Sequence, residues 1–311
     1  MAKNYFADAS KARVQITNTQ VRAIRSMYKD LAEEIAEESA RLSTRTNISS
    51  IMRRQYLANL SRQINKELDD IGKMQGSTIR ANMQAVAAAI VKDNVFLLNK
   101  MGVNATAAYS HIPSDIVKEV ASGQLYKGRW TLNSAIWGNT AKTKQDINTV
   151  IAKGIAGQKS TYEIAKDLEQ YVNPLKRKDW DWSKVYPGTN KVVDYNAQRL
   201  ARTMVSHAYQ DAFVRTTKDN PFIDSYRWLA SGGDRMCEVC AERDGKIFEK
   251  DELPLDHPNG MCTFEAVISK SFNQIGEELA DWVNGENHPE LDNFAESLGY
   301  TPITLKSKVS K

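Results

Sequence analysis

Four residues that can bind a metal ion lie close together in this sequence. Cys237, Cys240, His257 and Cys262 follow the spacing C-x2-C-x16-H-x4-C. The chain has three cysteines and four histidines in 311 residues, and this window holds all three cysteines. Zinc binds thiolate sulfur and imidazole nitrogen in a tetrahedron, and three cysteines with one histidine are a common structural set. The window constrains the fold around it more than any other feature of the chain.

The residues between these ligands are compatible with a zinc site built from two turns. The segment 243–246 contains Asp-Gly, which tolerates the positive φ of a two-residue hairpin turn. Asn259 and Gly260 precede Cys262 and predict the second turn that carries ligands. With four protein ligands no position remains for water, so we expect zinc to be a structural cofactor here rather than a catalytic one.

Three other interpretations of the cysteines stay open. A disulfide between Cys237 and Cys240 would need an oxidising compartment, which nothing in the sequence indicates. A thioredoxin-like redox pair usually lies at a strand-to-helix junction, whereas Gly and Asp residues surround this pair. The last interpretation is that three free cysteines lie near one another by chance.

Composition narrows the class of protein. The sequence has no run of 18 apolar residues, so no membrane span is expected. Its first residues lack the apolar stretch of a secretory signal, so we expect the protein to stay in the cytoplasm where it is made. The net charge of +4 is only a weak argument for nucleic-acid binding. The length allows two domains.

The first hundred residues predict long amphipathic helices. Hydrophobic residues recur every seven positions from Val14 to Ile35, with a second stripe between them. Residues 44–50 interrupt this pattern, and a second helix follows whose end Gly72 and Gly76 weaken before a third stripe begins. The pattern favours a helix pair or an extended coiled coil, and a helical arm that docks on a partner is the functional form of the same pattern.

Two further helices are expected at 146–172 and at about 195–217. Ser160 and Glu163 predict a capping box within the first of these segments. His207 lies one turn from Arg202 in the second, which suggests a catalytic pair or, as the structural alternative, a surface or partly buried histidine.

A linker is expected between these helices, at residues 176–192. It combines basic and aromatic side chains, which can bind nucleic acid by charge and stacking. The candidate contacts are Lys176, Arg177, Lys178, Trp180 and Trp182. The segment 126–130 has the same character, although such aromatic residues also pack in cores.

Three short strands frame the metal window, at 226–229, 246–248 and 263–268. The predicted fold class is therefore mainly α: a long N-terminal helical region, then a small α+β C-terminal domain with a short antiparallel sheet and a Cys3His zinc site. The proposed domains are a helical region at 1–175, the linker at 176–192, a domain at 193–285 with the zinc window 237–262, and a C-terminal helix with a basic tail at 286–311.

Several motifs together resemble the phage head-morphogenesis family, which includes minor head proteins similar to the F protein of phage Mu. They are Ala-Arg-Thr at 201–203, Trp228, the C-x2-C pair, the Asp-Gly turn, and His-Pro-Asn-Gly-Met-Cys at 257–262. Met204 departs from the pattern, because many relatives carry an acidic residue after the Arg-Thr pair. The resemblance covers roughly 195–268, and the helical region before it is similar to that of relatives from phages and prophages of Gram-positive hosts.

This resemblance implies that residues 193–285 are a Mu F-like minor head domain. It further implies a non-enzymatic protein, present in few copies inside the procapsid and virion after assembly in the host cytoplasm. Its expected partners are the portal protein, the scaffold or major capsid protein, and double-stranded DNA during packaging or ejection. Self-association is compatible with the helical arm.

Two other functions stay open. The first is a metal-dependent nuclease of the His-Asn-His type, because Asp256-His257 resembles the start of that motif, although Asn273 and His288 have the wrong spacing for its remainder. The second is a sequence-independent DNA-binding protein, with the basic and aromatic residues of the linker as its contacts.

Overall fold

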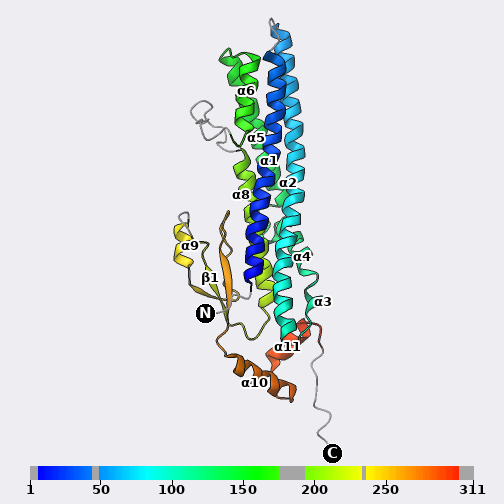
Figure 1. Ribbon diagram of the computed structural model, residues 1–311, viewed down its shortest axis with the longest axis vertical. Coiled ribbons are helices and arrows are strands. Elements are labelled where there is room, and N and C mark those ends of the chain that lie inside the picture. Colours follow the sequence, from blue (N-terminus) through cyan, green and yellow to red (C-terminus); the bar gives the residue numbers. More distant parts are fainter. Residues whose placement is uncertain (1–5, 44–48, 176–192, 233–235, 301–311) are drawn as a thin grey trace, which may run out of the picture. The chain divides into compact units, whose positions relative to one another are not determined.

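The computed structural model describes residues 6–43, 49–175, 193–232 and 236–300, which are mainly helical (Figure 1). The predicted class is confirmed: long N-terminal helices are followed by a small antiparallel sheet of three strands. The elements in chain order are α1 Ala7–Ser43, α2 Ser50–Lys100, α3 Thr106–Tyr109, α4 Ile112–Ser122, η1 Gln124–Tyr126, α5 Leu132–Ala156, α6 Thr161–Val172, α8 Val193–Thr217, β1 Ser225–Leu229, α9 Glu238–Arg243, β2 Ile247–Glu249, β3 Thr263–Val267, α10 Phe272–Val283 and α11 Pro289–Ser297.

The chain divides into two compact units, each assembled from segments that are distant in sequence. Unit 1 comprises Met1–Ile16, Asn82–Val120 and Thr203–Lys311, and unit 2 comprises Thr17–Ala81 and Ala121–Arg202. The domain boundaries proposed from the sequence stay a prediction, and the proposed linker at 176–192 lies outside the described residues.

In unit 2, helices α1 and α2 run side by side (Figure 1). Ile24, Leu31 and Ile35 of α1 are buried, as the heptad pattern predicted. Tyr28 is buried with them, and its hydroxyl accepts a hydrogen bond of 3.2 Å from Nε2 of Gln75 in α2. Hydrophobic side chains three and four residues apart thus give each helix one face that avoids water.

Helix α2 continues through Gly72 and Gly76, where the sequence predicted a weakened helix end. A methyl group at Gly72 would lie 3.2 Å from Oγ1 of Thr140, and one at Gly76 would lie 3.4 Å from Cδ1 of Ile136. Both neighbours belong to α5, so the two glycines let α5 approach α2 closely. Burial on either side of this point outweighs the low helix propensity of glycine.

The start of the predicted heptad stripe on α1 is wrong by one residue. Val14 is 41% exposed, whereas the preceding Arg13 is only 2% exposed. The buried positions run from Arg13 through Thr17 and Gln20 to Ile24. A search for hydrophobic periodicity passes over polar residues, so it cannot detect a buried arginine.

Unit 1 contains the sheet, whose strands lie in the order β2-β1-β3 with both pairs antiparallel. Side chains alternate along a strand, so Tyr226 and Trp228 of β1 share one face. Phe213 of α8 packs there: its ring centroid lies 5.1 Å from that of Tyr226 and 5.9 Å from that of Phe264 in β3. These aromatic contacts attach the sheet to α8.

Two helices, α10 and α11, follow the sheet, and α11 is the C-terminal helix expected within 286–311. Ile275 of α10 and Leu291 of α11 pack with Phe222 in a small apolar cluster. No helix in the described ranges combines the length and the apolar character that a membrane span requires.

Two glycines in α5 give a matched test of how closely the helices of unit 2 pack. A Cβ at Gly154 would lie 2.6 Å from Cγ1 of Ile164 in α6, whereas one at Gly138 would meet nothing within 4 Å. We expect Gly154→Ala to lower the free energy of unfolding by about 1–3 kcal/mol through overpacking. Gly138→Ala should instead raise it by about 0.5–1 kcal/mol, because alanine favours the helix. Chemical denaturation measures both, and a Gly154→Ala variant as stable as Gly138→Ala would contradict the close contact.

Candidate metal centre

The C-x2-C pair lies at the start of a short helix, not in a hairpin. Cys237 is the N-cap of α9, and its Sγ accepts a hydrogen bond of 3.4 Å from the backbone N–H of Cys240. One helical turn brings residues three apart to the same side, so both sulfurs face one volume. The predicted two-residue turn at Asp244-Gly245 is present, with a hydrogen bond of 2.9 Å from the Lys246 N–H to the Arg243 carbonyl and a φ of +74° at Gly245. It joins the end of α9 to β2, so the predicted hairpin between two strands is wrong.

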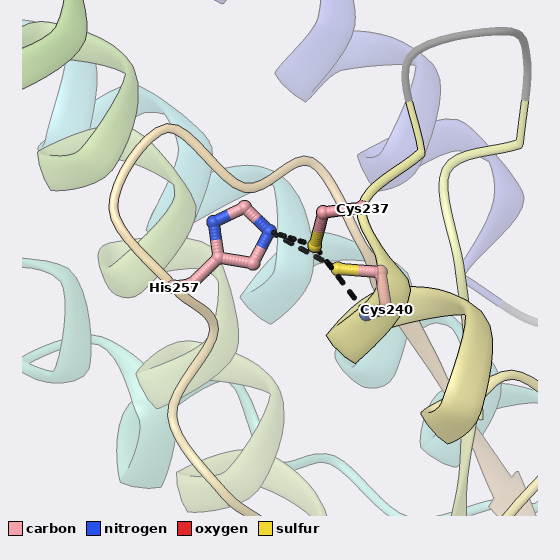
Figure 2. Close-up of side chains that lie close together, drawn as sticks. All are labelled: Cys237, Cys240 and His257. Atoms are coloured by element: carbon pink, nitrogen blue, oxygen red, sulfur yellow. Dashed lines mark hydrogen bonds between the residues drawn. The ribbon is translucent and has the colours of Figure 1, made fainter.

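His257 faces the two sulfurs with one particular ring nitrogen (Figure 2). Its Nε2 lies 3.3 Å from Sγ of Cys237 and 3.1 Å from Sγ of Cys240. Its Nδ1 lies 3.0 Å from the carbonyl oxygen of Pro258, which can only accept a hydrogen bond. Nδ1 therefore carries the proton, and the lone pair of Nε2 is directed at the sulfurs. A second hydrogen bond of this kind typically fixes a metal-binding histidine.

Cys262, the residue directly before β3, lies at the same place. Its Sγ lies 3.3 Å from Sγ of Cys240, and both side chains are buried. Cys240 thus belongs to two groups whose ligand atoms lie within 4.8 Å of one another: Cys237, Cys240 and His257 in one, and Cys240, Asp256 and Cys262 in the other. All four residues predicted as ligands gather around Cys240, and the cluster is compatible with a metal site.

The distances from Cys240 to its two neighbours, His257 and Cys262, are close to those in a tetrahedral metal site. At a Zn–S bond of about 2.3 Å, neighbouring sulfurs in a tetrahedron lie roughly 3.7 Å apart. The separations around Cys240, 3.1 Å to His257 Nε2 and 3.3 Å to Cys262 Sγ, are a few tenths of an ångström shorter.

Protonation of the thiols depends on burial and on backbone hydrogen bonding. Burial, followed by the hydrogen bonds with Cys262 and Cys237, raises the pKa of Cys240 far above its usual range. Burial and the Asp256 carboxylate raise the pKa of Cys262. The backbone N–H of Cys240 lowers the pKa of Cys237. Two of the three thiols thus hold their protons at neutral pH unless a cation displaces them, which makes binding of a metal and release of protons one event.

Asp256 was not predicted as part of this cluster, and it organises the loop that carries His257 and Cys262. Its Oδ1 accepts a hydrogen bond of 2.9 Å from the backbone N–H of His257, and its Oδ2 accepts one of 3.2 Å from that of Cys262. The predicted turn at Asn259-Gly260 is present, with a φ of +70° at Asn259 and a hydrogen bond of 2.8 Å from the Gly260 N–H to the His257 carbonyl.

A polar face of α8 holds this loop in place. The four residues that form it recur at the spacing of helical turns, and each donates to or accepts from the backbone of residues 254–260. Three side chains donate to carbonyl oxygens of the loop: Ser206 Oγ to Gly260 at 2.7 Å, His207 Nε2 to Asp256 at 2.9 Å, and Gln210 Nε2 to Pro254 at 2.8 Å. Two side-chain oxygens accept from backbone N–H groups of the loop: Thr203 Oγ1 from Asn259 at 2.9 Å, and Gln210 Oε1 from Asp256 at 2.9 Å.

His207 is one of these loop-holding residues, and it is 2% exposed. Burial lowers its pKa, so the neutral ring donates from Nε2 to the Asp256 carbonyl. This agrees with the structural interpretation of His207 rather than the catalytic one. The sequence contained a signal for the group: polar residues at positions 203, 206, 207 and 210 lie on one face of a helix that is otherwise apolar there.

The candidate nucleic-acid contacts Lys176, Arg177, Lys178, Trp180 and Trp182 lie outside the described residues. In the similar segment at 126–130, the ring of Trp130 stacks on that of Tyr126 with centroids 4.1 Å apart.

Gly260 tests whether Asp256 maintains the loop. A Cβ at this position would lie 2.2 Å from both carboxylate oxygens of Asp256, so Gly260→Ala must displace the carboxylate. We expect faster hydrogen exchange at the His257 and Cys262 amides and a loss of about 1–3 kcal/mol in stability. Gly276→Ala in α10 is the control, because its Cβ would meet nothing within 4 Å. Unchanged exchange at both amides would contradict this role of Asp256.

Comparison with known families identifies the region that contains the cluster. Residues 145–264 match the family model described as phage Mu protein F like protein, a segment that runs from within α5 to within β3. The comparisons with curated proteins and with solved structures gave no match. The matched segment holds all four predicted ligands and the polar face of α8. The chain therefore carries a phage Mu protein F-like region over residues 145–264, which confirms its resemblance to the phage head-morphogenesis family.

Proposed function

We propose that this protein is a non-enzymatic phage head-morphogenesis protein that associates with the portal inside the procapsid. The observation that carries the proposal is the phage Mu protein F-like match over residues 145–264, which suggests a head-morphogenesis protein and association with the virion. Helices α1 and α2 are 37 and 51 residues long and supply the helical arm that we expect to dock on a partner. Assistance in DNA packaging or ejection is the finer part of this proposal.

We propose further that the Cys/His cluster binds zinc in a structural role. Three sulfurs and one imidazole nitrogen are ligands that zinc prefers, and four protein ligands complete its tetrahedron. Cys237, Cys240, His257 and Cys262 would hold the ion, which would tie α9 to the loop before β3. The indole N–H of Trp228 supports this assignment, because it is buried without a regular hydrogen-bond partner among the described residues. It also lowers the pKa of the Cys262 thiol, whereas burial and Asp256 raise it. A thiolate at Cys262 would be a stronger acceptor for it.

The geometry of His257 favours a structural centre over a nuclease. A nuclease of the His-Asn-His type needs a histidine free to act as a general base and a metal ion with an open coordination position. Here the lone pair of Nε2 is directed at two sulfurs and Nδ1 donates to a carbonyl, so neither nitrogen faces outward for such a role. Sequence-independent DNA binding through residues 176–182 stays a prediction that can coexist with the assembly role.

Zinc content is the direct test of the metal. Protein purified without added metal should contain about one zinc ion per chain by plasma mass spectrometry, since a structural Cys3His site binds tightly. Cys240→Ser should abolish the zinc and expose the segment 225–268 to protease, because structural zinc contributes on the order of 10 kcal/mol to folding of small domains. The helices of unit 2 should keep their protease resistance. An unchanged proteolysis pattern would contradict the structural role.

Two histidines provide a matched control for this measurement. His257→Gln should lose most of the zinc, because it removes the Nε2 ligand. His111→Gln should retain it, since His111 is exposed and its Nε2 lies 3.8 Å from Asp115 within α4. Equal zinc in both variants would remove His257 from the ligand set.

Co-assembly tests the role in the head. Co-expressed with the portal protein of the same phage or prophage, the full chain should co-sediment with portal rings, whereas an unrelated portal should not retain it. The same preparation should leave plasmid DNA intact in Mg²⁺ or Mn²⁺. Metal-dependent nicking that His257→Ala abolishes would overturn the non-enzymatic assignment and favour the nuclease.

A further inference from the structure

Arg13 of α1 is a buried cation beside the metal cluster. Its side chain is 2% exposed, although arginine is almost never fully buried unless its donors are paired. The residue lies far from the cysteines in sequence, and both belong to unit 1. Neither the hydrophobic pattern of α1 nor the cysteine spacing explains its presence there.

The guanidinium group of Arg13 binds the backbone of the loop at the ligand Cys262. Its NH1 donates to the carbonyl oxygen of Cys262 at 2.8 Å, and its NH2 donates to that of Met261 at 2.7 Å. NH1 also donates to Oγ of Ser206 at 3.2 Å, and the same Oγ donates to the Gly260 carbonyl. Arg13 therefore extends the group of side chains with which α8 holds the loop, but from a different helix.

The charge of Arg13 complements the centre. Burial lowers its pKa, while Tyr209, Asp256 and Cys262 act against that shift. An arginine stays charged under these conditions, because its ordinary pKa lies above 12. Its guanidinium lies 4.6 Å from the ring centroid of Tyr209, which stabilises the cation further. Three thiolates around a divalent ion leave one net negative charge, to which Asp256 adds another, and Arg13 lies close enough to offset part of it.

We propose that Arg13 is a positioning residue of the metal centre, and that metal binding is thermodynamically coupled to docking of the first turns of α1 on the loop 256–262. The inference rests on the proposed zinc site. Arg13 does not touch the metal ligand atoms in this arrangement; it holds the backbone from which Cys262 extends. Coupling of this kind is reciprocal, so metal should stabilise the docked helix by the same factor by which the docked helix strengthens metal binding.

The geometry predicts that lysine cannot replace this arginine. The planar guanidinium spans two successive carbonyl groups at once, whereas an ammonium group is a single charged point on a flexible chain. Arg13→Lys keeps the charge but loses the paired contact, and Arg13→Gln loses both. Lys11→Gln is the matched control, because Lys11 precedes Arg13 by two residues in α1 and its side chain is 76% exposed.

The first measurement is zinc transfer from each full-length variant to a coloured chelator. Changes in residues that support metal ligands typically weaken metal binding about 10- to 100-fold. We expect zinc release to be about 10- to 100-fold faster for Arg13→Gln than for the unaltered protein. The increase should be smaller for Arg13→Lys, and the rate should not change for Lys11→Gln. Replacement of zinc by Co²⁺ adds a spectroscopic readout: the thiolate-to-cobalt absorption should change in the Arg13 variants, which a loss of stability elsewhere in the chain would not produce.

The second measurement uses the unaltered protein, so it does not depend on a variant that folds. Hydrogen exchange at residues 9–16 should become faster when a chelator removes the metal, and more so than at residues 112–120 of α4, which belong to the same unit. Equal changes in both helices would mean general loosening and would overturn the specific coupling.

The outcomes separate this inference from the proposed metal. Wild-type protein that is folded, reduced and without zinc overturns the zinc site and the coupling together. Wild-type protein that binds zinc, with release rates equal in Arg13→Gln and Lys11→Gln, overturns the role of Arg13 alone and leaves the structural zinc site intact.

Discussion

The metal cluster depends on the hydrogen bonds that α8 makes to the backbone of the loop 254–260. Backbone groups buried in a loop have no ladder partner, and each one left unpaired would cost about 1–3 kcal/mol. Thr203, Ser206, His207 and Gln210 satisfy these groups. Because α8 also packs through Phe213 against the sheet, one helix sets the position of both the loop and β3. The ligands can then converge although they come from separate segments.

Much of this arrangement could be predicted from sequence, because local rules specify it. The spacing of Cys237, Cys240, His257 and Cys262 identified the cluster, and the turn at Asn259-Gly260 followed from residue type. The capping box of Ser160 and Glu163 is present, with hydrogen bonds of 3.2 Å and 2.6 Å. In each case the information lies within a few residues of chain, where propensity and side-chain chemistry decide the structure.

What the sequence did not predict depends on tertiary contacts. Asp-Gly is compatible both with a hairpin and with the end of a helix. Here it follows a helix, because Cys237 of the C-x2-C pair caps the start of α9. Gly72 and Gly76 weaken a helix only where nothing packs against them, and here α5 occupies the space beside them. Arg13 was missed for a related reason: its partners are carbonyl groups of Met261 and Cys262, which any residue would offer, so no side-chain motif marks them.

A sheet of three short strands buries little apolar surface, and the Cys/His cluster beside it could hold a metal ion. Phe213 packs on the face of β1 that carries Tyr226, whereas the loop before β3 is held by hydrogen bonds to α8. Its order must come from directional contacts, which stabilise only when every member is satisfied. Asp256 satisfies two amides, α8 satisfies the remaining backbone groups named above, and Arg13 binds two carbonyls. Burial raises the pKa of the Cys240 and Cys262 thiols, and a divalent cation would exchange their protons for coordinate bonds. A metal ion in this place would add its coordinate bonds to the hydrogen bonds that Asp256, α8 and Arg13 make to the loop.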